Sequence, residues 1–176
     1  MPSYYEYIIS SLPALSFGAK PPMSLERLLS MCKDMVRESD MKALEAVKEG
    51  ALYSKAAAGI GAFKKWASFD IMLKNEIVAL RAARKKIDPS KFMRQNGDPE
   101  SYRASHIAIN AYRAASPIDT EKMLDIERWR ELDDMSFGHY FDADALAIYA
   151  LKLAILEKWE KIRTADKMAL LEKSLA

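Results

Sequence analysis

The sequence predicts an all-α protein, an irregular bundle of about six or seven helices around a buried apolar helix at residues 144–162. Glycine (6) and proline (7) are few among the 176 residues, while alanine, leucine, lysine, glutamate and methionine are abundant, which favours helix. No proline falls within 23–88 or 118–176, so those two tracts can hold long helices. Residues 144–162 are apolar on almost every side, so that helix needs partners on several faces.

Composition bounds the class of protein. Apolar residues make up 50% and charged residues 30%, as in globular proteins, and no linker divides the chain, so we expect one domain over 1–176. The net charge of +2 is too small to give an overall electrostatic field that would attract nucleic acid or an acidic membrane. A single cysteine, Cys32, excludes an internal disulfide and fits a reducing compartment. Without a membrane-spanning run or a signal peptide, the expected location is cytoplasmic.

The N-terminal segment 3–12 is aromatic and β-branched, and its pattern fits either a short helix capped by Ser3 or a strand. We favour the helix because nothing else in the chain supplies a sheet partner. Its cluster consists of Tyr4, Tyr5, Tyr7, Ile8 and Ile9. Residues 13–23 hold three prolines and a glycine, which predicts an extended linker that Leu15 and Phe17 attach to the core.

Two helices are expected next. Ser24 should cap a helix that runs to about Arg37 and places one apolar face inward: Leu25, Leu28, Leu29, Cys32 and Met35 or Val36. Ser39-Asp40 should start a shorter helix over 41–49, with Met41, Leu44 and Val47 inward and Gly50 as its stop. Residues 51–61 are alanine-rich, and Gly59-x-Gly61 predicts a break before the next element.

The longest helix is expected over 62–88, where Asp88-Pro89 ends it. Its apolar stripe comprises Phe63, Trp66, Leu73, Ile77, Leu80 and Ile87. Asp70 interrupts that stripe. Because a buried carboxylate is costly unless it is paired, we expect an arginine or lysine from a neighbouring helix to meet it. The alternative is a polar residue that faces a partner, if this helix is shared with another subunit.

An open polar loop is predicted over 89–97, and Asp98 with Pro99 should cap a helix to about Ala115. The residues expected inward on that helix are Tyr102, His106, Ile109 and Tyr112. Ser116-Pro117 or Asp119 should cap the following helix, which turns at Gly138. Its inward residues are Leu124, Ile126, Trp129, Leu132 and Met135. Asp142 or Asp144 should cap the apolar helix, and residues 164–175 should add a tail helix.

An acidic turn offers the most evident candidate site, with the weak metal ligands Asp134, His139 and Asp142, flanked by Asp133 and Asp144. Neither an EF-hand loop nor a His-Glu-x-x-His motif is present. Helix capping explains the same residues, and we favour it. We therefore expect no metal and no cofactor.

Enzymatic motifs are missing elsewhere as well. Gly-x-Ser-x-Gly is absent, and Gly59-Ile60-Gly61 lacks the rest of a phosphate loop. His106 and Cys32 both fall on faces expected to be buried, which argues against a Cys–His nucleophilic pair. The sequence thus predicts a protein that is not an enzyme by itself.

A basic cluster lies at the end of the long helix: Arg81, Arg84, Lys85, Lys86, Lys91 and Arg94. Cations near a helix C-terminus are stabilising, so a solvated helix end is the simpler interpretation. The functional alternative is a contact with an acidic protein partner. RNA and a membrane surface rank below such a partner. The candidate partner contacts are the N-terminal tyrosines Tyr4, Tyr5 and Tyr7 and the basic residues Arg81, Arg84, Lys85 and Lys86.

Three segments carry a family resemblance: YYEYIISSLPALSFGAKPPMSLERLLSMC, WASFDIMLKNEIVALRAARKKID and ERWRELDDMSFGHYFDADALAIYALKLAILEKW. Together they resemble an uncharacterised bacterial family that carries a domain of unknown function and is encoded among the genes of V/A-type rotary ATPases. More distantly, the aromatic N-terminus and the Asp-helix-Leu-Arg pattern are similar to the central-stalk C (eukaryotic d) subunit, although this chain is much shorter. The resemblance implies a partner, the ATPase, and a location peripheral to the inner face of the cell membrane. It implies no catalytic residues.

Three hypotheses follow. The first is a non-enzymatic accessory or stalk-associated subunit of a V/A-type ATPase that acts by protein–protein contact, with no direct nucleic-acid binding. The second is a small nucleic-acid or regulatory binding protein that uses the basic residues of 81–94. The third is a metal-dependent enzyme that uses the acidic turn at 133–144.

Overall fold

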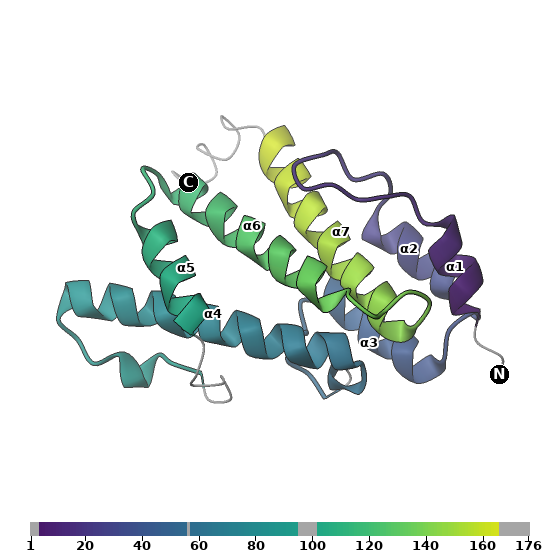
Figure 1. The fold of residues 1–176 in the computed structure, drawn as a ribbon, viewed down its shortest axis with the longest axis horizontal. Helices are drawn as coiled ribbons and strands as arrows, with labels where there is room; N and C mark the ends of the chain where they lie inside the picture. Colours follow the sequence, from purple (N-terminus) through teal and green to yellow (C-terminus); the bar gives the residue numbers. More distant parts are fainter. Residues whose placement is uncertain (1–3, 56, 95–101, 166–176) are drawn as a thin grey trace, which may run out of the picture.

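The computed structural model describes residues 4–55, 57–94 and 102–165. Those residues form seven α-helices, two short 3-10 segments and no strand, so the all-α prediction is confirmed (Figure 1). The helices are α1 (Tyr5–Ser11), α2 (Leu25–Cys32), α3 (Glu38–Lys48), α4 (Gly61–Lys85), α5 (Tyr102–Tyr112), α6 (Pro117–Met135) and α7 (Ala143–Thr164). The 3-10 segments are η1 (Ala57–Gly59) and η2 (Pro89–Lys91).

Helix α7 occupies the centre, as its apolar sequence predicts. Its buried side chains are Leu146, Ala147, Ile148, Ala150, Leu151, Leu153, Ile155 and Leu156. It packs against α1, α2, α3, α4 and α6, which explains why apolar residues appear on more than one face. Figure 1 shows α6 and α7 as an antiparallel hairpin with α4 crossing beneath it and α5 against the C-terminal half of α4.

The N-terminal segment is a helix, as expected. Tyr4, and not Ser3, occupies its N-cap position, and it makes no side-chain cap hydrogen bond. The Tyr4 N–H instead donates to the carbonyl of Met35 (2.9 Å), which attaches the start of α1 to the turn that follows α2. The linker 13–23 has no regular structure, and Phe17 packs edge-on against Trp129 with ring centroids 5.6 Å apart. Both anchors, Leu15 and Phe17, contact the core as predicted.

Two boundaries differ from the prediction. Helix α2 ends at Cys32, five residues before Arg37, because Lys33 leaves the helical conformation (ψ 132°) and Asp34 then turns left-handed (φ 63°). Helix α3 begins at Glu38, so Asp40 lies inside it and is buried, and does not cap it. The carboxylate of Asp40 accepts hydrogen bonds from Tyr5 and Arg37, which link α1 to α3.

Gly61 starts α4 where the sequence predicts a break. The carboxylate of Asp144, in the first turn of α7, accepts a hydrogen bond from the N–H of Ala62 and so caps α4 from another helix. A Cβ atom on Gly61 would lie 3.0 Å from Asp144 Oδ1, so glycine leaves the room for this approach. Helix α4 ends at Lys85 because its C-cap, Lys86, has a left-handed backbone (φ 54°). The helix therefore stops before the predicted end at Asp88, and Ile87 is 46% exposed, not buried.

Helix α5 buries a different face from the one predicted. The inward residues are small or aliphatic, namely Ala104, Ile107, Ala108 and Ala111, while His106, Ile109 and Tyr112 are exposed. Three of the four inward residues are alanines, whose small side chains allow α5 to lie close to α4, and His106, Ile109 and Tyr112 fall on the outer side of the helix. The Asp98-Pro99 cap, the side chain of Tyr102 and the tail helix beyond 165 lie outside what the structure describes.

Three predicted caps are confirmed. Ser24 Oγ accepts the N–H of Arg27 at 3.1 Å and starts α2. Ser116 Oγ accepts the N–H of Asp119 at 3.2 Å and starts α6, and Asp142 Oδ1 accepts the N–H of Ala145 at 2.8 Å and starts α7. Over the described ranges, none of the helices combines the length and apolar character needed to cross a membrane.

Candidate functional site

An open groove of about 680 Å³ lies at the C-terminal end of α4. Its floor is apolar and comes from three segments, with Val78 and Ala82 on α4, Ile87 and Phe92 on the returning chain, and Tyr112 at the end of α5. Its edge carries the cationic side chains Arg81, Arg84 and Lys85. We refer to these eight residues as the α4-end groove.

Local backbone geometry assembles the groove. Val78, Ala82 and Lys85 follow one another at helical spacing, so they share one side of α4. The left-handed Lys86 then reverses the chain, and the Ile87 N–H bonds back to the Ala82 carbonyl at 3.1 Å. Asp88 accepts the Ser90 N–H at 3.0 Å and caps η2, which brings the chain to Phe92.

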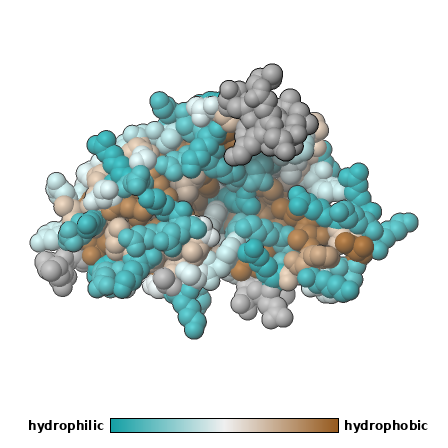
Figure 2. All heavy atoms as spheres, turned by 180° about the vertical axis from the view of Figure 1, so that it is seen from behind, coloured by the Kyte–Doolittle hydropathy of each residue, from teal (hydrophilic) through white to brown (hydrophobic). Residues whose placement is uncertain are grey.

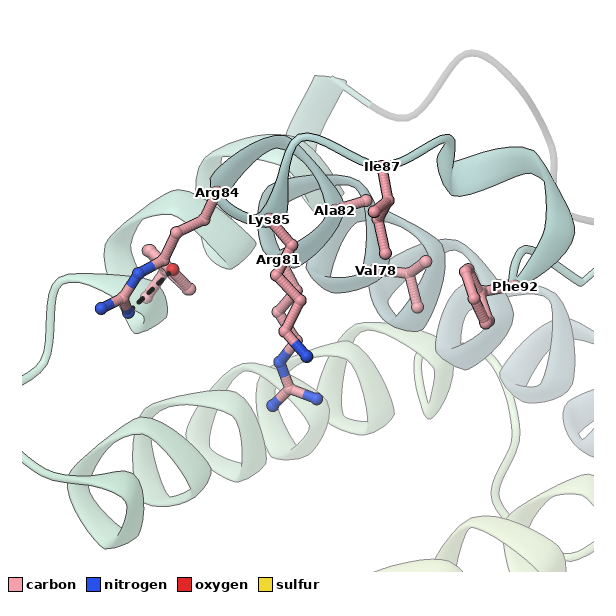
Figure 3. Close-up of a pocket in the computed structure, with 8 residues that line it drawn as sticks. Val78, Arg81, Ala82, Arg84, Lys85, Ile87 and Phe92 are labelled. Carbon is pink, nitrogen blue, oxygen red and sulfur yellow. Dashed lines mark hydrogen bonds between the residues drawn. The ribbon is translucent and has the colours of Figure 1, made fainter.

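The side chains divide the groove into an apolar and a cationic side. In Figure 3, Arg81 and Lys85 extend side by side, and Val78, Ile87 and Phe92 line the opposite side. Ile87, Phe92 and Tyr112 are 46%, 59% and 39% exposed, which leaves a large apolar surface in contact with water. Seen from behind in Figure 2, hydrophobic atoms appear between hydrophilic ones at the right-hand end of the molecule, where α4 ends.

The electrostatics of the groove are one-sided. None of its eight residues is acidic, and within the described part of the chain Arg81 and Lys85 make no ion pair. Arg84 Nη1 donates to the Tyr112 hydroxyl at 3.4 Å, and this contact raises the pKa of the guanidinium. By contrast, Lys74 on the same helix pairs with Asp70 at 2.7 Å. The groove therefore presents donors and positive charge without internal neutralisation.

The structure divides the predicted basic cluster. Arg81, Arg84 and Lys85 edge the groove, whereas Lys86 is the C-cap of α4 and does not line it. Arg94 turns away, with its guanidinium 4.8 Å from the centroid of the Tyr53 ring. The sequence does not reveal the apolar floor, because the floor residues come from three segments. Phe92, an aromatic residue in a polar loop, was the available signal.

The N-terminal tyrosines are also divided. Tyr4 and Tyr7 are exposed, but Tyr5 is buried and its hydroxyl donates to Asp40. Burial, followed by the hydrogen bond to Asp40, raises the pKa of Tyr5. Tyr5 is therefore a structural residue, and the prediction that it contacts a partner is wrong. Of the three tyrosines, only Tyr4 and Tyr7 are exposed to a partner.

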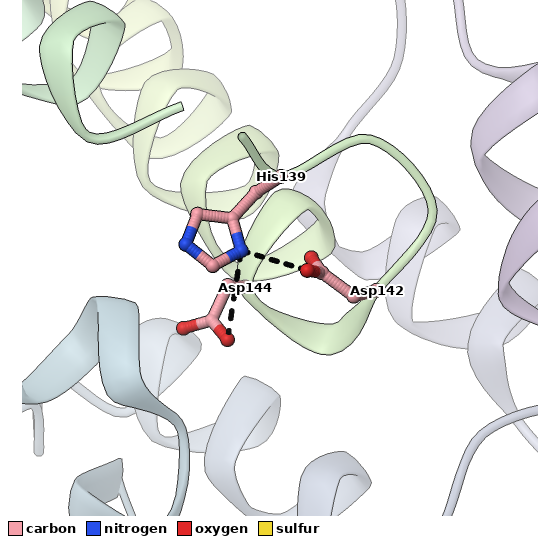
Figure 4. A group of neighbouring side chains, drawn as sticks. All are labelled: His139, Asp142 and Asp144. Atoms are coloured by element: carbon pink, nitrogen blue, oxygen red, sulfur yellow. Dashed lines mark hydrogen bonds and ion pairs between the residues drawn. The ribbon is translucent and has the colours of Figure 1, made fainter. Parts of the chain in front are cut away.

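The acidic turn brings His139, Asp142 and Asp144 together, while Asp134 is not part of the group (Figure 4). His139 Nδ1 lies 2.7 Å from Asp142 Oδ2 and 4.0 Å from Asp144 Oδ2. One ligand atom from each residue could hold a divalent ion, since these atoms lie within 4.8 Å of one another. Both carboxylates already cap helices, however, α7 through Asp142 and α4 through Asp144. Partial burial would raise the pKa of Asp142, but the Ala145 N–H and His139 outweigh it and lower that pKa.

Buried charge gathers in a second place, between α4, α6 and α7. Asp125 is only 1% exposed and accepts hydrogen bonds from Arg128 (2.7 Å), Lys158 (2.7 Å) and the Trp159 indole (2.9 Å). Arg128 also reaches Asp70. Across the described residues every buried side-chain polar atom has a partner, so this network joins helices and offers no unpaired group to a substrate.

A second exposed apolar surface occupies the turn between α6 and α7. Phe137, Tyr140 and Phe141 are 88%, 67% and 53% exposed. We refer to these three residues as the aromatic turn. Figure 1 shows that this turn and the C-terminal end of α4 lie at opposite ends of the molecule.

The fold and these surfaces define an all-helical protein whose most developed candidate site is a cation-edged apolar groove. Residues 107–168, from within α5 through α7, match a family described as "Protein of unknown function (DUF2764)". The match covers the α6–α7 hairpin, one of the segments that carry the resemblance to an uncharacterised family. No curated protein and no solved structure matches the chain.

Proposed function

We propose that the chain is a non-enzymatic adaptor that acts by protein–protein contact as an accessory or stalk-associated subunit of a bacterial V/A-type rotary ATPase. The α4-end groove is the observation that supports a protein–protein contact, because exposed apolar surface edged by charge is typical of an interaction site. The sequence resemblance supports the choice of ATPase.

The shape of the molecule suits an adaptor. Helix α4 has 25 residues and is therefore about 37 Å long. The groove lies at one end of the molecule, and the aromatic turn lies at the other (Figure 1). Two separate contact surfaces, connected by packed helices, would allow one chain to join two neighbours in a complex.

The test is isolation of the tagged full chain from its native host, with ATPase subunits identified by mass spectrometry. We expect the wild-type protein to recover them and Arg81→Glu/Lys85→Glu to lose them. The matched control is Lys64→Glu/Lys65→Glu, which makes the same charge change on exposed residues at the other end of α4. A wild-type sample that lacks ATPase subunits, taken from cells that express the ATPase, contradicts the proposal.

Nucleic-acid binding is the second candidate, and the positions of Phe92 and Tyr112 beside Arg81 favour it. Exposed aromatic rings next to cations are a feature of single-strand binding. This function requires retention of the protein on an RNA or DNA column at low salt, with release as the salt concentration rises. Passage through both columns at low salt rejects it.

A further inference from the structure

We infer that the α4-end groove receives an acidic amphipathic helix from its partner, with the apolar side of that helix on the floor and its carboxylates against Arg81 and Lys85. This inference rests on the part of the proposed function that assigns protein–protein contact to this groove, and not on the ATPase as the partner. It adds the kind of segment that binds, and it holds for any partner that carries such a helix.

The walls of the groove favour a helical occupant. They consist of α4, α5 and a 3-10 turn, and the N–H groups of Ile87 and Phe92 are already bonded to the carbonyls of Ala82 and Pro89. The groove therefore offers no strand edge to an extended segment. Against an apolar floor, the polar backbone of an extended segment would lose its water, whereas a helix satisfies its own backbone hydrogen bonds.

The floor also sets the size of the occupant. Val78 and Lys85, both on α4, are seven positions apart, which is about 10 Å along the helix axis. A partner helix of about three turns would cover that distance with apolar residues at i, i+3, i+4 and i+7. Phe92 and Tyr112, exposed on different segments, supply the aromatic surface against which those residues would pack.

Charge determines the chemistry of the occupant. Arg81 and Lys85 lie four residues apart on α4 and, in the residues described, have no carboxylate partner. The three cations on the edge, with no acidic residue in the groove, would attract an acidic segment and disfavour a basic one. A nucleic acid fits less well, because three of the five floor residues, Val78, Ala82 and Ile87, are aliphatic and only two aromatic rings are available for base stacking.

The first experiment uses a fluorescent synthetic peptide of about 14 residues, a glutamate-rich amphipathic helix with leucine and phenylalanine at i, i+3, i+4 and i+7. Two control peptides have the same composition in scrambled order and the same pattern with lysine in place of glutamate. We expect fluorescence anisotropy to show binding of the full chain to the patterned acidic peptide, at least about tenfold tighter than to either control. Equal affinity for all three peptides overturns the inference.

Variants locate the binding. Arg81→Glu/Lys85→Glu and Phe92→Ala should each weaken binding of the acidic peptide by about tenfold or more, whereas Lys64→Glu/Lys65→Glu should change it less than about twofold. All the altered residues are exposed, and circular dichroism confirms that each variant is folded. An affinity that is unchanged in the groove variants contradicts the inference.

A second experiment identifies the native occupant. A photo-crosslinking amino acid replaces Phe92 in the full chain in its host, and mass spectrometry identifies the attached peptide. The expected peptide has a net negative charge and helical apolar periodicity. Attachment to RNA, or to the aromatic turn of a second copy of this chain, contradicts the inference. If an acidic helix from a protein outside the ATPase is recovered, the groove assignment stands and the proposed ATPase function falls.

Discussion

The guanidinium of Arg128 on α6 lies 3.2 Å from the carboxylate of Asp70 on α4, and the pair joins two helices through residues 58 positions apart in the chain. Asp70 interrupts an apolar stripe, and its side chain is only 9% exposed. Lys74 (2.7 Å) and the Tyr53 hydroxyl complete its surroundings. The sequence predicted a cationic partner from a neighbouring helix, and this pair confirms that prediction.

Removal of Arg128 should destabilise the protein strongly. Arg128→Met removes the cation that Asp70 and Asp125 share. Lys74 remains on Asp70 and Lys158 remains on Asp125, so we expect a loss of about 1.5–3 kcal/mol, the contribution of a hydrogen bond to a charged group. Urea denaturation measures the free energy of unfolding. The control is Arg130→Met on the same helix, where an exposed pair with Glu127 is worth no more than about 1 kcal/mol. Similar losses in the two variants would show that the buried pair has no special weight.

Asp70 should make stability depend on pH. Burial tends to raise its pKa, but Arg128, Lys74 and Tyr53 together outweigh that effect, and the pKa lies below its ordinary value. A depressed pKa contributes stability above the unfolded value of about 3.9, and the contribution is lost as the pH falls through the folded pKa. Asp70→Asn should therefore be less stable than wild type at pH 7, and the two should converge below about pH 4. A constant difference across this pH range would contradict the assignment.

Gly61 and Asp144 should show coupled effects on stability. Asp144→Ala removes the cap of α4 and should cost about 1 kcal/mol. Gly61→Ala places a Cβ atom 3.0 Å from Asp144 Oδ1, so we expect it to destabilise wild type. In the Asp144→Ala background the same change should be neutral or stabilising, because alanine favours helix more than glycine does. Thermal or urea unfolding of the four proteins completes the double-mutant cycle, and additive effects would argue against the contact.

Cys32 should react slowly in the native protein. The side chain is fully buried, and burial raises the pKa of its thiol to about 11. Compared with a free cysteine near pKa 8.5, the thiolate at pH 8 is rarer by roughly two orders of magnitude. Ellman's reagent should label the native chain much more slowly than the chain in guanidinium chloride. Rapid native labelling would show that α2 opens readily at this position.

Much of the fold follows from local chemistry in the sequence. The burial of α7, the caps at Ser116 and Asp142 and the need of Asp70 for a cation all depend on the properties of adjacent residues, namely helical periodicity, short polar side chains and the cost of burying charge. These predictions required no knowledge of which helices meet.

Tertiary structure decided everything that depends on which helices meet. It chose Arg128 as the partner of Asp70, turned Asp144 into the cap of α4 and buried Tyr5 against Asp40. It also built the α4-end groove by bringing Phe92 and Tyr112 to the end of α4. These contacts join residues from separate segments, and periodicity or capping within one segment carries no information about the distance to another. The sequence by itself therefore determined the helices and the central position of α7, while the groove exists only because packing places three segments side by side.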